Sequence, residues 1–183
     1  MLKHGILGLL NYGDMTGYEI HEAFETSLNF FWPAQTSQIY RELTVLEKNK
    51  WIVKQTVEQS SKPNKNICSI TEEGRKELLR WLSDPGINID MRSPTLMKIF
   101  FMGELPVSSS LDFFEQLNDK CRIGFEALQQ TDASITSYQE MIPDKKSAVF
   151  WQMTADFGKR YAQMYLEWIE HCIHLLKNME ESQ

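Results

Sequence analysis

The fold is decided by the stretch "PAQTSQIYRELTVLEKNKWIVKQTVE", Pro33–Glu58, where a helical pattern runs directly into a strand pattern. Hydroxyl and cationic side chains recur in it at i, i+4, i+7 and i+11: Ser37, Arg41, Thr44 and Lys48. At about 100° per residue these side chains form one line along a helix, here called the cationic stripe. The opposite face is apolar and must be buried: Ile39, Leu43 and Leu46. The pattern predicts a helix whose apolar face is buried in the core and whose exposed face, the cationic stripe, is suited to a polyanion.

The bulk composition describes a globular protein with a hydrophobic core. The chain has 183 residues, of which 42% are hydrophobic and 24% charged, enough for one ordinary domain or two small ones. No run of about 18 apolar residues predicts a membrane helix, and the start "MLKHGILGLLNYGDM" does not resemble a signal peptide. Three widely spaced cysteines indicate neither a zinc site nor a disulfide framework, which favours a reducing cytoplasm: Cys68, Cys121 and Cys172.

The net charge of −6 hides a difference between the two halves of the chain. Residues 1–83 carry ten Lys/Arg and ten Asp/Glu, whereas residues 84–183 carry nine and fifteen. Within residues 36–71 the balance is positive, with six basic and three acidic side chains. Only charges close to phosphates displace counterions, so this local excess is what a DNA-reading element needs.

The first part of the chain predicts two helices before the cationic stripe. A short helix ends near Gly13, and "TGYE" then forms a capping box with Thr16 as N-cap and Glu19 three residues later. The second helix buries a stripe of large apolar residues and is broken at Pro33. We expect Thr36 to cap the third helix.

From Trp51 the pattern changes to a β-hairpin and a further helix. The runs "WIVKQTVEQ" and "NICSI" predict two strands around the turn cluster "SSKPN", and Thr71 is placed to cap the helix "TEEGRKELLRWL". Three helices, a hairpin and a helix make a winged helix-turn-helix over residues 1–83. The predicted class is mainly α with a small β-hairpin wing.

The rest of the chain reads as helical. Residues 84–94, "DPGINIDMRSP", form the predicted linker, and residues 95–183 the predicted dimerisation domain. A segment near 95–104 precedes a long helix that Ser110 is placed to cap and that reaches about Tyr138. In the last helix, from about 147 to 179, apolar residues recur every three or four positions. One small domain cannot cover such a stripe, which predicts a homodimer with this interface: Phe150, Met153, Phe157, Tyr161, Met164, Trp168 and Leu175.

In this order, the elements make the chain resemble the PadR-like transcriptional regulators with a long helical C-terminal region. The matching segments are "ILGLL", "TGYEI", "TSQIYRELTVLE", "ITEEGRKEL" and "RSPTLMKIFFMGEL". The resemblance covers nearly the whole chain, although "ITEEG" alone recurs in many winged-helix proteins. It implies a homodimeric repressor, occasionally an activator, and in some relatives an aromatic-lined dimer pocket for small planar compounds.

The predicted DNA contacts lie on the third helix and the hairpin tip. The wing carries fewer arginines and aromatics than the family wing often has, so weaker contacts are expected there. Tyr40, beside the stripe, either touches a phosphate or packs. The expected set for double-stranded DNA is Thr36, Ser37, Gln38, Tyr40, Arg41, Thr44, Lys48, Lys62, Asn64 and Lys65.

Tryptophans mark a candidate effector pocket. Trp32 directly precedes the third helix, while Trp151 and Trp168 lie on the last one, so a folded-back dimer would bring both sets to one cavity. A planar aromatic effector bound there would re-aim the third helix. The alternative is that these rings are packed core, with control by abundance alone.

No catalytic motif, metal site or cofactor is predicted. There is no GxSxG and no phosphate-cradling glycine loop. Glu167, His171 and His174 share a helical face, but without a fourth ligand they are better explained as a polar flank. Two classes remain: a DNA-binding regulator, and a helical protein-interaction module that keeps a winged-helix shape. The local positive charge favours the regulator.

Overall fold

The computed structural model describes residues 1–57, 65–86, 93–129, 135–136, 140 and 146–181. The chain divides into two compact units, Met1–Ile87 and Asn88–Gln183. The hairpin tip with Lys62 and Asn64, and most of the predicted linker 84–94, lie outside the described residues. No described helix has the length and apolarity that a membrane span needs.

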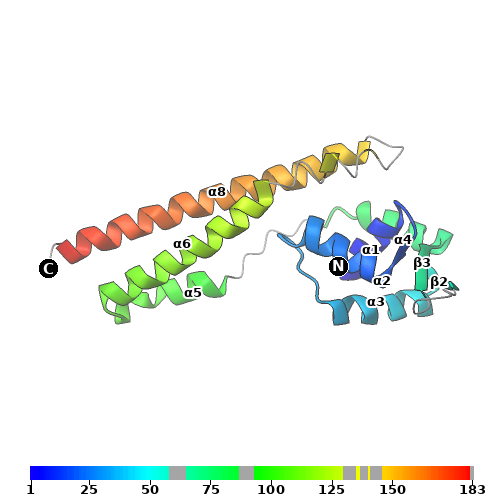
Figure 1. Cartoon of the computed structure of the whole chain (residues 1–183), viewed down its shortest axis with the longest axis horizontal. Coiled ribbons are helices and arrows are strands. Elements are labelled where there is room, and N and C mark those ends of the chain that lie inside the picture. The colour runs from blue at the N-terminus through cyan, green and yellow to red at the C-terminus, as the bar shows by residue number, and fades with distance from the viewer. Residues whose placement is uncertain (58–64, 87–92, 130–134, 137–139, 141–145, 182–183) are drawn as a thin grey trace. The chain divides into compact units, whose positions relative to one another are not determined.

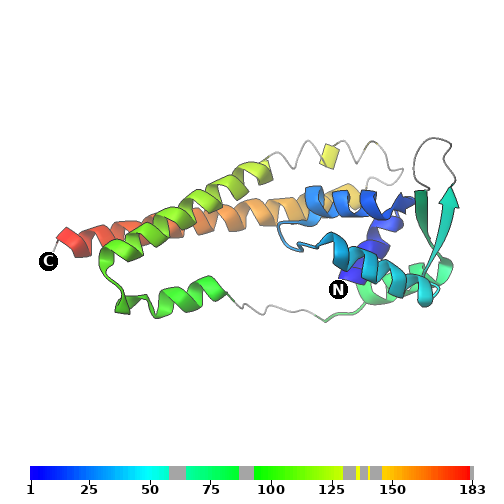
Figure 2. The ribbon, with the colours of Figure 1, turned by 60° about the horizontal axis from the view of Figure 1, so that its bottom comes forward.

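The first unit contains helices α1 (Leu2–Leu10), α2 (Gly17–Ala23), α3 (Thr36–Lys48) and α4 (Glu72–Leu82), with a π-helical turn, η1 (Phe24–Leu28), after α2 (Figure 1). Strands β2 (Ile52–Val57) and β3 (Lys65–Ile70) form the predicted antiparallel hairpin (Figure 2). A third strand, β1 (Met15–Thr16), pairs with β3 and was not predicted. Its two residues are too short for a periodic signal. The winged helix-turn-helix is confirmed.

One hydrophobic core joins these elements. It contains α1, α2, α3 and α4 side chains together with Ile52 and Cys68 of the hairpin. The apolar face predicted for α3 is buried in it, since Ile39 and Leu46 are fully enclosed and Leu43 is 2% exposed. Burial of the apolar face of α3 therefore fixes which of its side chains point to solvent.

The predicted caps differ in outcome. Thr16 and Glu19 form the capping box of α2, and the Thr71 hydroxyl accepts a hydrogen bond from the Gly74 N–H at the start of α4. The cap predicted at Thr36 is wrong: Thr36 is the first helical residue of α3, and the N-cap of this helix is Gln35. The Gln35 N–H donates to the Gln38 side chain at 3.0 Å, so two glutamines fill the role expected of a threonine.

Gly74 allows α4 to approach the turn that enters the hairpin. A Cβ at this position would lie 2.1 Å from the Trp51 carbonyl oxygen. The same turn is attached to α4 through Thr71, whose N–H donates to that carbonyl at 3.0 Å and whose hydroxyl donates to the Lys50 carbonyl at 2.7 Å. Lys50 has a φ of 60°, a left-handed conformation that is uncommon for lysine.

Replacing Gly74 with alanine should therefore destabilise the first unit by about 1–3 kcal/mol, because backbone must move to admit the methyl group. The measurement is the urea midpoint of the full chain. Gly8→Ala in α1 is the matched control: apart from its chain neighbours and its own helix backbone, no described atom lies within 4 Å of its new Cβ, and helix propensity predicts a gain of roughly 0.5–1 kcal/mol. Equal effects of the two substitutions would contradict the close approach.

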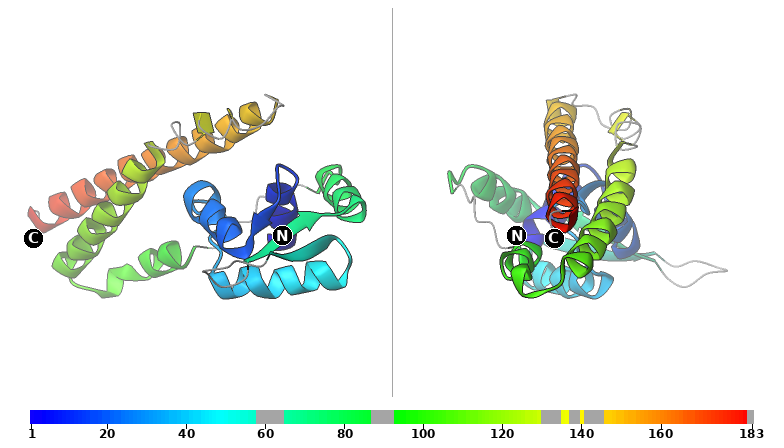
Figure 3. Two further views of the ribbon diagram at one scale, coloured as in Figure 1. Left: turned by 45° about the vertical axis from the view of Figure 1, so that its right-hand side comes forward. Right: turned by 90° about the vertical axis from the view of Figure 1, so that its left-hand side faces the viewer.

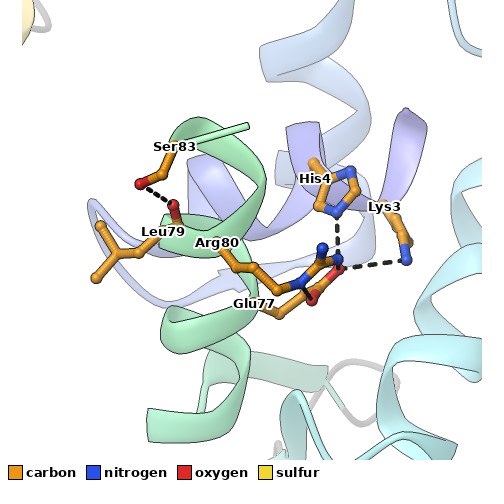
Figure 4. A network of polar contacts seen from close by, with 6 residues as sticks. All are labelled: Lys3, His4, Glu77, Leu79, Arg80 and Ser83. Atoms are coloured by element: carbon orange, nitrogen blue, oxygen red, sulfur yellow. Dashed lines mark hydrogen bonds and ion pairs between the residues drawn. The ribbon is translucent and has the colours of Figure 1, made fainter. Parts of the chain in front are cut away.

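A partly buried polar network joins α1 to α4 (Figure 4). The His4 ring is stacked on Trp81 with centroids 4.6 Å apart, and its Nε2 lies 3.0 Å from Glu77 Oε1. A carboxylate only accepts, so Nε2 carries the hydrogen. Arg80 donates two hydrogen bonds of 2.8 Å to the same carboxylate. These bonds from Arg80, and then the one from His4, lower the pKa of Glu77 to about 2.

The ionised form of Glu77 is thus favoured by folding. With an ordinary pKa of 4.5 and a folded value of about 2, its stabilisation is complete above about pH 5 and is lost as the pH falls towards about 2. Glu77→Gln should lower the free energy of unfolding most near neutral pH, and its curve should converge on the parent's under acid. Denaturant unfolding across this range is the measurement. A difference between the two proteins that stays constant down to about pH 2 would contradict this role of the Glu77 charge.

The second unit is built from α5 (Pro94–Phe100), a 3-10 turn η2 (Met102–Glu104), α6 (Val107–Gln129) and α8 (Lys146–Glu181). α6 and α8 run side by side in opposite directions (Figures 1 and 3). Ser110 is not a cap but a buried residue inside α6. The helix starts earlier, and the Ser110 N–H donates to the Pro106 carbonyl at 3.2 Å. The end predicted at Tyr138 lies outside the described residues.

α8 has two faces that differ in burial. One packs on α6, where Ile169 is fully buried and Trp168 meets Phe114 edge-on at 6.0 Å. The other keeps most of the predicted interface exposed within this single chain, between 49% and 65%: Phe150, Met153, Phe157, Tyr161, Met164 and Leu175. The exposed apolar face and the face that packs on α6 are thus separate on this helix.

Candidate nucleic-acid interface

The cationic stripe is exposed along the whole front of α3. Its side chains all face solvent on the side opposite the buried apolar residues: Ser37, Arg41, Thr44 and Lys48. Figure 3 shows α3 lying alongside the hairpin, and α3 contacts β2. Thr36 and Gln38 are exposed as well, at the first turn of the helix. The structure thus brings the helical part of the predicted DNA-binding set onto one accessible surface.

Two stripe side chains are tied to the helix backbone. Arg41 Nε donates to the Ser37 carbonyl at 3.3 Å, which leaves both terminal amino groups of the guanidinium for a ligand. The Thr44 hydroxyl donates to the Tyr40 carbonyl at 3.1 Å, so Thr44 offers a methyl group and acceptor lone pairs. Such a surface combines a forked donor with an apolar contact, the chemistry that reads guanine and thymine in the major groove.

Tyr40 packs and remains accessible at the same time. Its ring lies so close to Gly17, at the start of α2, that a Cβ there would come within 2.7 Å of the ring. The residue is nevertheless 51% exposed. Gly17 therefore lets the ring of Tyr40 brace α3 against α2.

The lysines around the hairpin are engaged by carboxylates. Lys65 Nζ lies 3.2 Å from Glu19 Oε1, and Lys54 Nζ lies 2.6 Å from Glu47 Oε2. Within the described residues, neither Arg41 nor Lys48 forms an ion pair. Neither pair was predicted: Glu19 and Lys65 are 46 positions apart, and Glu47 and Lys54 lie on a helix and a strand with different periods. Of these four described cations, Arg41 and Lys48 on α3 are therefore the two left available to a ligand.

The predicted effector tryptophans occupy different settings. Trp32 is 39% exposed and follows two other exposed aromatics, Phe30 and Phe31, just before α3. Trp168 is half-buried against Phe114 and Tyr165. Trp151 precedes Trp168 by 17 positions, about 25 Å along one helix at 1.5 Å per residue. On a single α8, one small planar compound can touch only one of these two rings.

No group of three potential metal ligands converges in the described part of the chain. His174 lies 3.3 Å from the Asn178 amide nitrogen, and Glu167 accepts a hydrogen bond from Gln163 at 2.8 Å. Cys68 is buried, which raises the pKa of its thiol. Each of these side chains is thus accounted for by a hydrogen bond within its own helix or by burial in the core.

Comparison with known proteins gives two adjoining family matches. The model described as transcriptional regulator PadR-like family matches residues 6–80, and the one described as virulence activator alpha C-term matches residues 91–177. A probable transcriptional regulator of Mycobacterium tuberculosis is 42% identical over 84 residues, 46% of this chain. That alignment spans only 44% of the mycobacterial protein.

A relative of similar length extends the likeness to the whole chain. The negative transcriptional regulator PadR of Bacillus subtilis is 28% identical over 185 residues, covering 96% of this chain and 97% of that protein. Its crystal structure with operator DNA matches with a TM-score of 0.79 and 27% identity, over 96% of this chain and 98% of that one. Its structure with p-coumaric acid matches with a TM-score of 0.73 and 25% identity, over 96% and 95%.

Proposed function

Because this chain belongs to the PadR-like transcriptional regulators, we propose that it is a homodimeric repressor that binds a pseudo-palindromic operator through α3. The observation that carries this function is the exposed cationic stripe on a helix whose other face is locked in the core. The Bacillus subtilis relative is named a negative regulator and has been solved with operator DNA, which supports repression over activation. The family of this chain is one of transcriptional regulators rather than enzymes. We propose that the chain acts in the cytoplasm.

In this proposal α3 enters the major groove. Arg41 reaches a base edge or a phosphate, Ser37 and Thr44 contribute short polar and methyl contacts, and Lys48 meets a phosphate near the helix end. Thr36, Gln38 and Tyr40 lie at the edges of the same contact. Two copies of α3 in a dimer read half-sites about one helical turn, ~34 Å, apart.

The dimer is proposed to form through residues 95–183. The exposed apolar side of α8 supports it, because a contiguous stripe of large side chains is costly to leave in water. A second copy offers the same stripe, so a two-fold interface can bury both.

A planar aromatic compound is the proposed effector class. The Bacillus subtilis relative was solved with p-coumaric acid, a planar aromatic acid. The rings available here are Trp32, next to α3, and Trp151 or Trp168 on α8. A compound that binds the DNA-incompetent state 100-fold more tightly would shift the equilibrium by about 2.7 kcal/mol.

The proposal is tested by recovering the DNA that the purified full-length protein retains from fragmented genomic DNA of its own source. A repressor of this kind should enrich a few fragments that share an inverted repeat, and should bind them far more tightly than random duplex at the same salt concentration. A protein-interaction module with a winged-helix shape would enrich nothing and would not shift random duplex at low salt.

A further inference from the structure

Two carboxylates of the first unit hold lysines beside the proposed DNA surface. Glu47 is in the last turn of α3, next to Lys48, and its carboxylate lies 2.6 Å from the ammonium of Lys54 on β2. The Lys54 side chain is 24% exposed and that of Glu47 is 46% exposed, so the pair lies at the surface where α3 meets the hairpin.

The second pair repeats this arrangement on the other face of the hairpin. Lys65, the first residue of β3, lies 3.2 Å from Glu19. Glu19 is fixed by its capping role, since it accepts hydrogen bonds from the Thr16 N–H and hydroxyl at 2.7 Å each. These bonds lower the pKa of Glu19, and the carboxylate stays ionised at neutral pH.

We propose that Glu47 and Glu19 are restraining residues, which hold Lys54 and Lys65 away from phosphates and so lower the affinity of the protein for DNA of any sequence. This inference rests on the proposed function. A lysine that binds a phosphate must first leave its carboxylate, and the carboxylate then remains as an unpaired negative charge near the DNA backbone. Each pair thus removes one counterion-releasing contact per subunit, while the cationic stripe keeps its own charge.

Lower general affinity has a direct use for a repressor. Phosphate contacts carry no sequence information, and a genome offers on the order of 10⁶–10⁹ non-specific sites. With two lysines restrained in each subunit, fewer molecules are held on these sites. More of the protein is then free to reach its operator and to be released from it.

Glu47→Gln in the full-length protein is the test, because Glu19 also caps α2 and cannot be changed cleanly. The substitution should free one lysine per subunit, two per dimer. The slope of log affinity for a random duplex against log salt should then steepen by roughly 1.8. Between 50 and 200 mM salt this is an additional tenfold loss of affinity, on top of tighter binding at the low end.

Glu42→Gln is the matched control. Glu42 is also on α3 and gives the same change in net charge, but it forms no ion pair within the described residues. If net charge alone were responsible, the two variants would have equal slopes, and the restraint would be refuted.

Lys54→Gln separates restraint from simple repulsion. In the parent, this substitution should leave the salt slope almost unchanged, because Lys54 is already held. In the Glu47→Gln background it should abolish the gain. A gain that persists without Lys54 would mean that Glu47 acts by repelling phosphates itself, which also overturns the inference.

The outcome is distinguishable from failure of the proposed function. If the parent binds no duplex at all, the regulator proposal fails before Glu47 is considered. If the parent binds its operator tightly and Glu47→Gln behaves like Glu42→Gln, the regulator stands and only the restraint is wrong.

Discussion

Arg41→Ala should lower operator affinity by at least about thirtyfold while leaving the fold intact. A bidentate arginine–guanine contact gives about 1–3 kcal/mol of discrimination, and a dimer loses one contact in each half-site, about 2–6 kcal/mol in total. Arg41 is exposed, and its one side-chain hydrogen bond within the described residues goes to the Ser37 carbonyl, so its removal leaves no buried group unpaired there. The measurement is a titration of the operator duplex at fixed salt, with thermal unfolding as the check on folding.

Two further variants distinguish a contact to a base edge from a contact to a phosphate. Arg41→Lys keeps the charge but loses the planar fork, so it should fail at a base edge and be tolerated at a phosphate. Lys48→Ala should weaken binding to all sequences alike and reduce the salt slope by roughly 1.8 per dimer. Operator affinity unchanged by both alanine substitutions would mean that the cationic stripe is not the reading surface.

The stripe could be predicted from the sequence because it depends on local periodicity alone. A spacing of 3.6 residues fixes which side chains share a face, and the positions of Ile39, Leu43 and Leu46 decide which face is buried. The hairpin followed from a change in period, and the cap at Thr71 from a residue type in the right place. Each of these signals lies within a dozen residues of the chain.

What the sequence did not reveal depends on neighbours far along the chain or on competing local geometry. Strand β1 exists because residues 15–16 pair with β3, some 50 positions later. The Glu19–Lys65 pair spans a similar distance. The caps expected at Thr36 and Ser110 failed since side-chain preference alone cannot decide between adjacent starting points, and Gln35 and Pro106 begin those helices earlier.

The exposed side of α8 leads to the second large expectation. Phe157 is 65% exposed in the single chain and stacks on Tyr161 at 6.2 Å, with Tyr165 and then Trp168 continuing the row of rings towards α6. The row passes from water into the unit's own core. A second copy that covers the exposed end would therefore extend an apolar interior that already exists at the other end.

Phe157→Ala should weaken the dimer by about 3 kcal/mol for each of its two copies, about 6 kcal/mol in total and roughly ten-thousandfold in its dissociation constant, because truncating a phenylalanine in an apolar interface costs about as much as in a core. Sedimentation across a range of protein concentrations measures this. The contact between Phe114 and Trp168 within one chain should persist, so near-ultraviolet circular dichroism should change little. Gln152→Ala, on α8 but outside the apolar stripe, should leave the dimer as it was.

Dimer strength and operator binding should then fall together. Two half-sites are read at once only by a dimer, so a monomer keeps the affinity of one half-site and loses the advantage of linkage. Phe157→Ala should therefore bind operator weakly at low protein concentration and recover as the concentration rises, whereas Arg41→Ala should remain weak throughout. If operator binding recovered at high protein concentration in both variants, or in neither, the expected link between dimer strength and operator binding would be contradicted. A parent protein that sediments as a monomer at micromolar concentration would rule out α8 as its dimer interface.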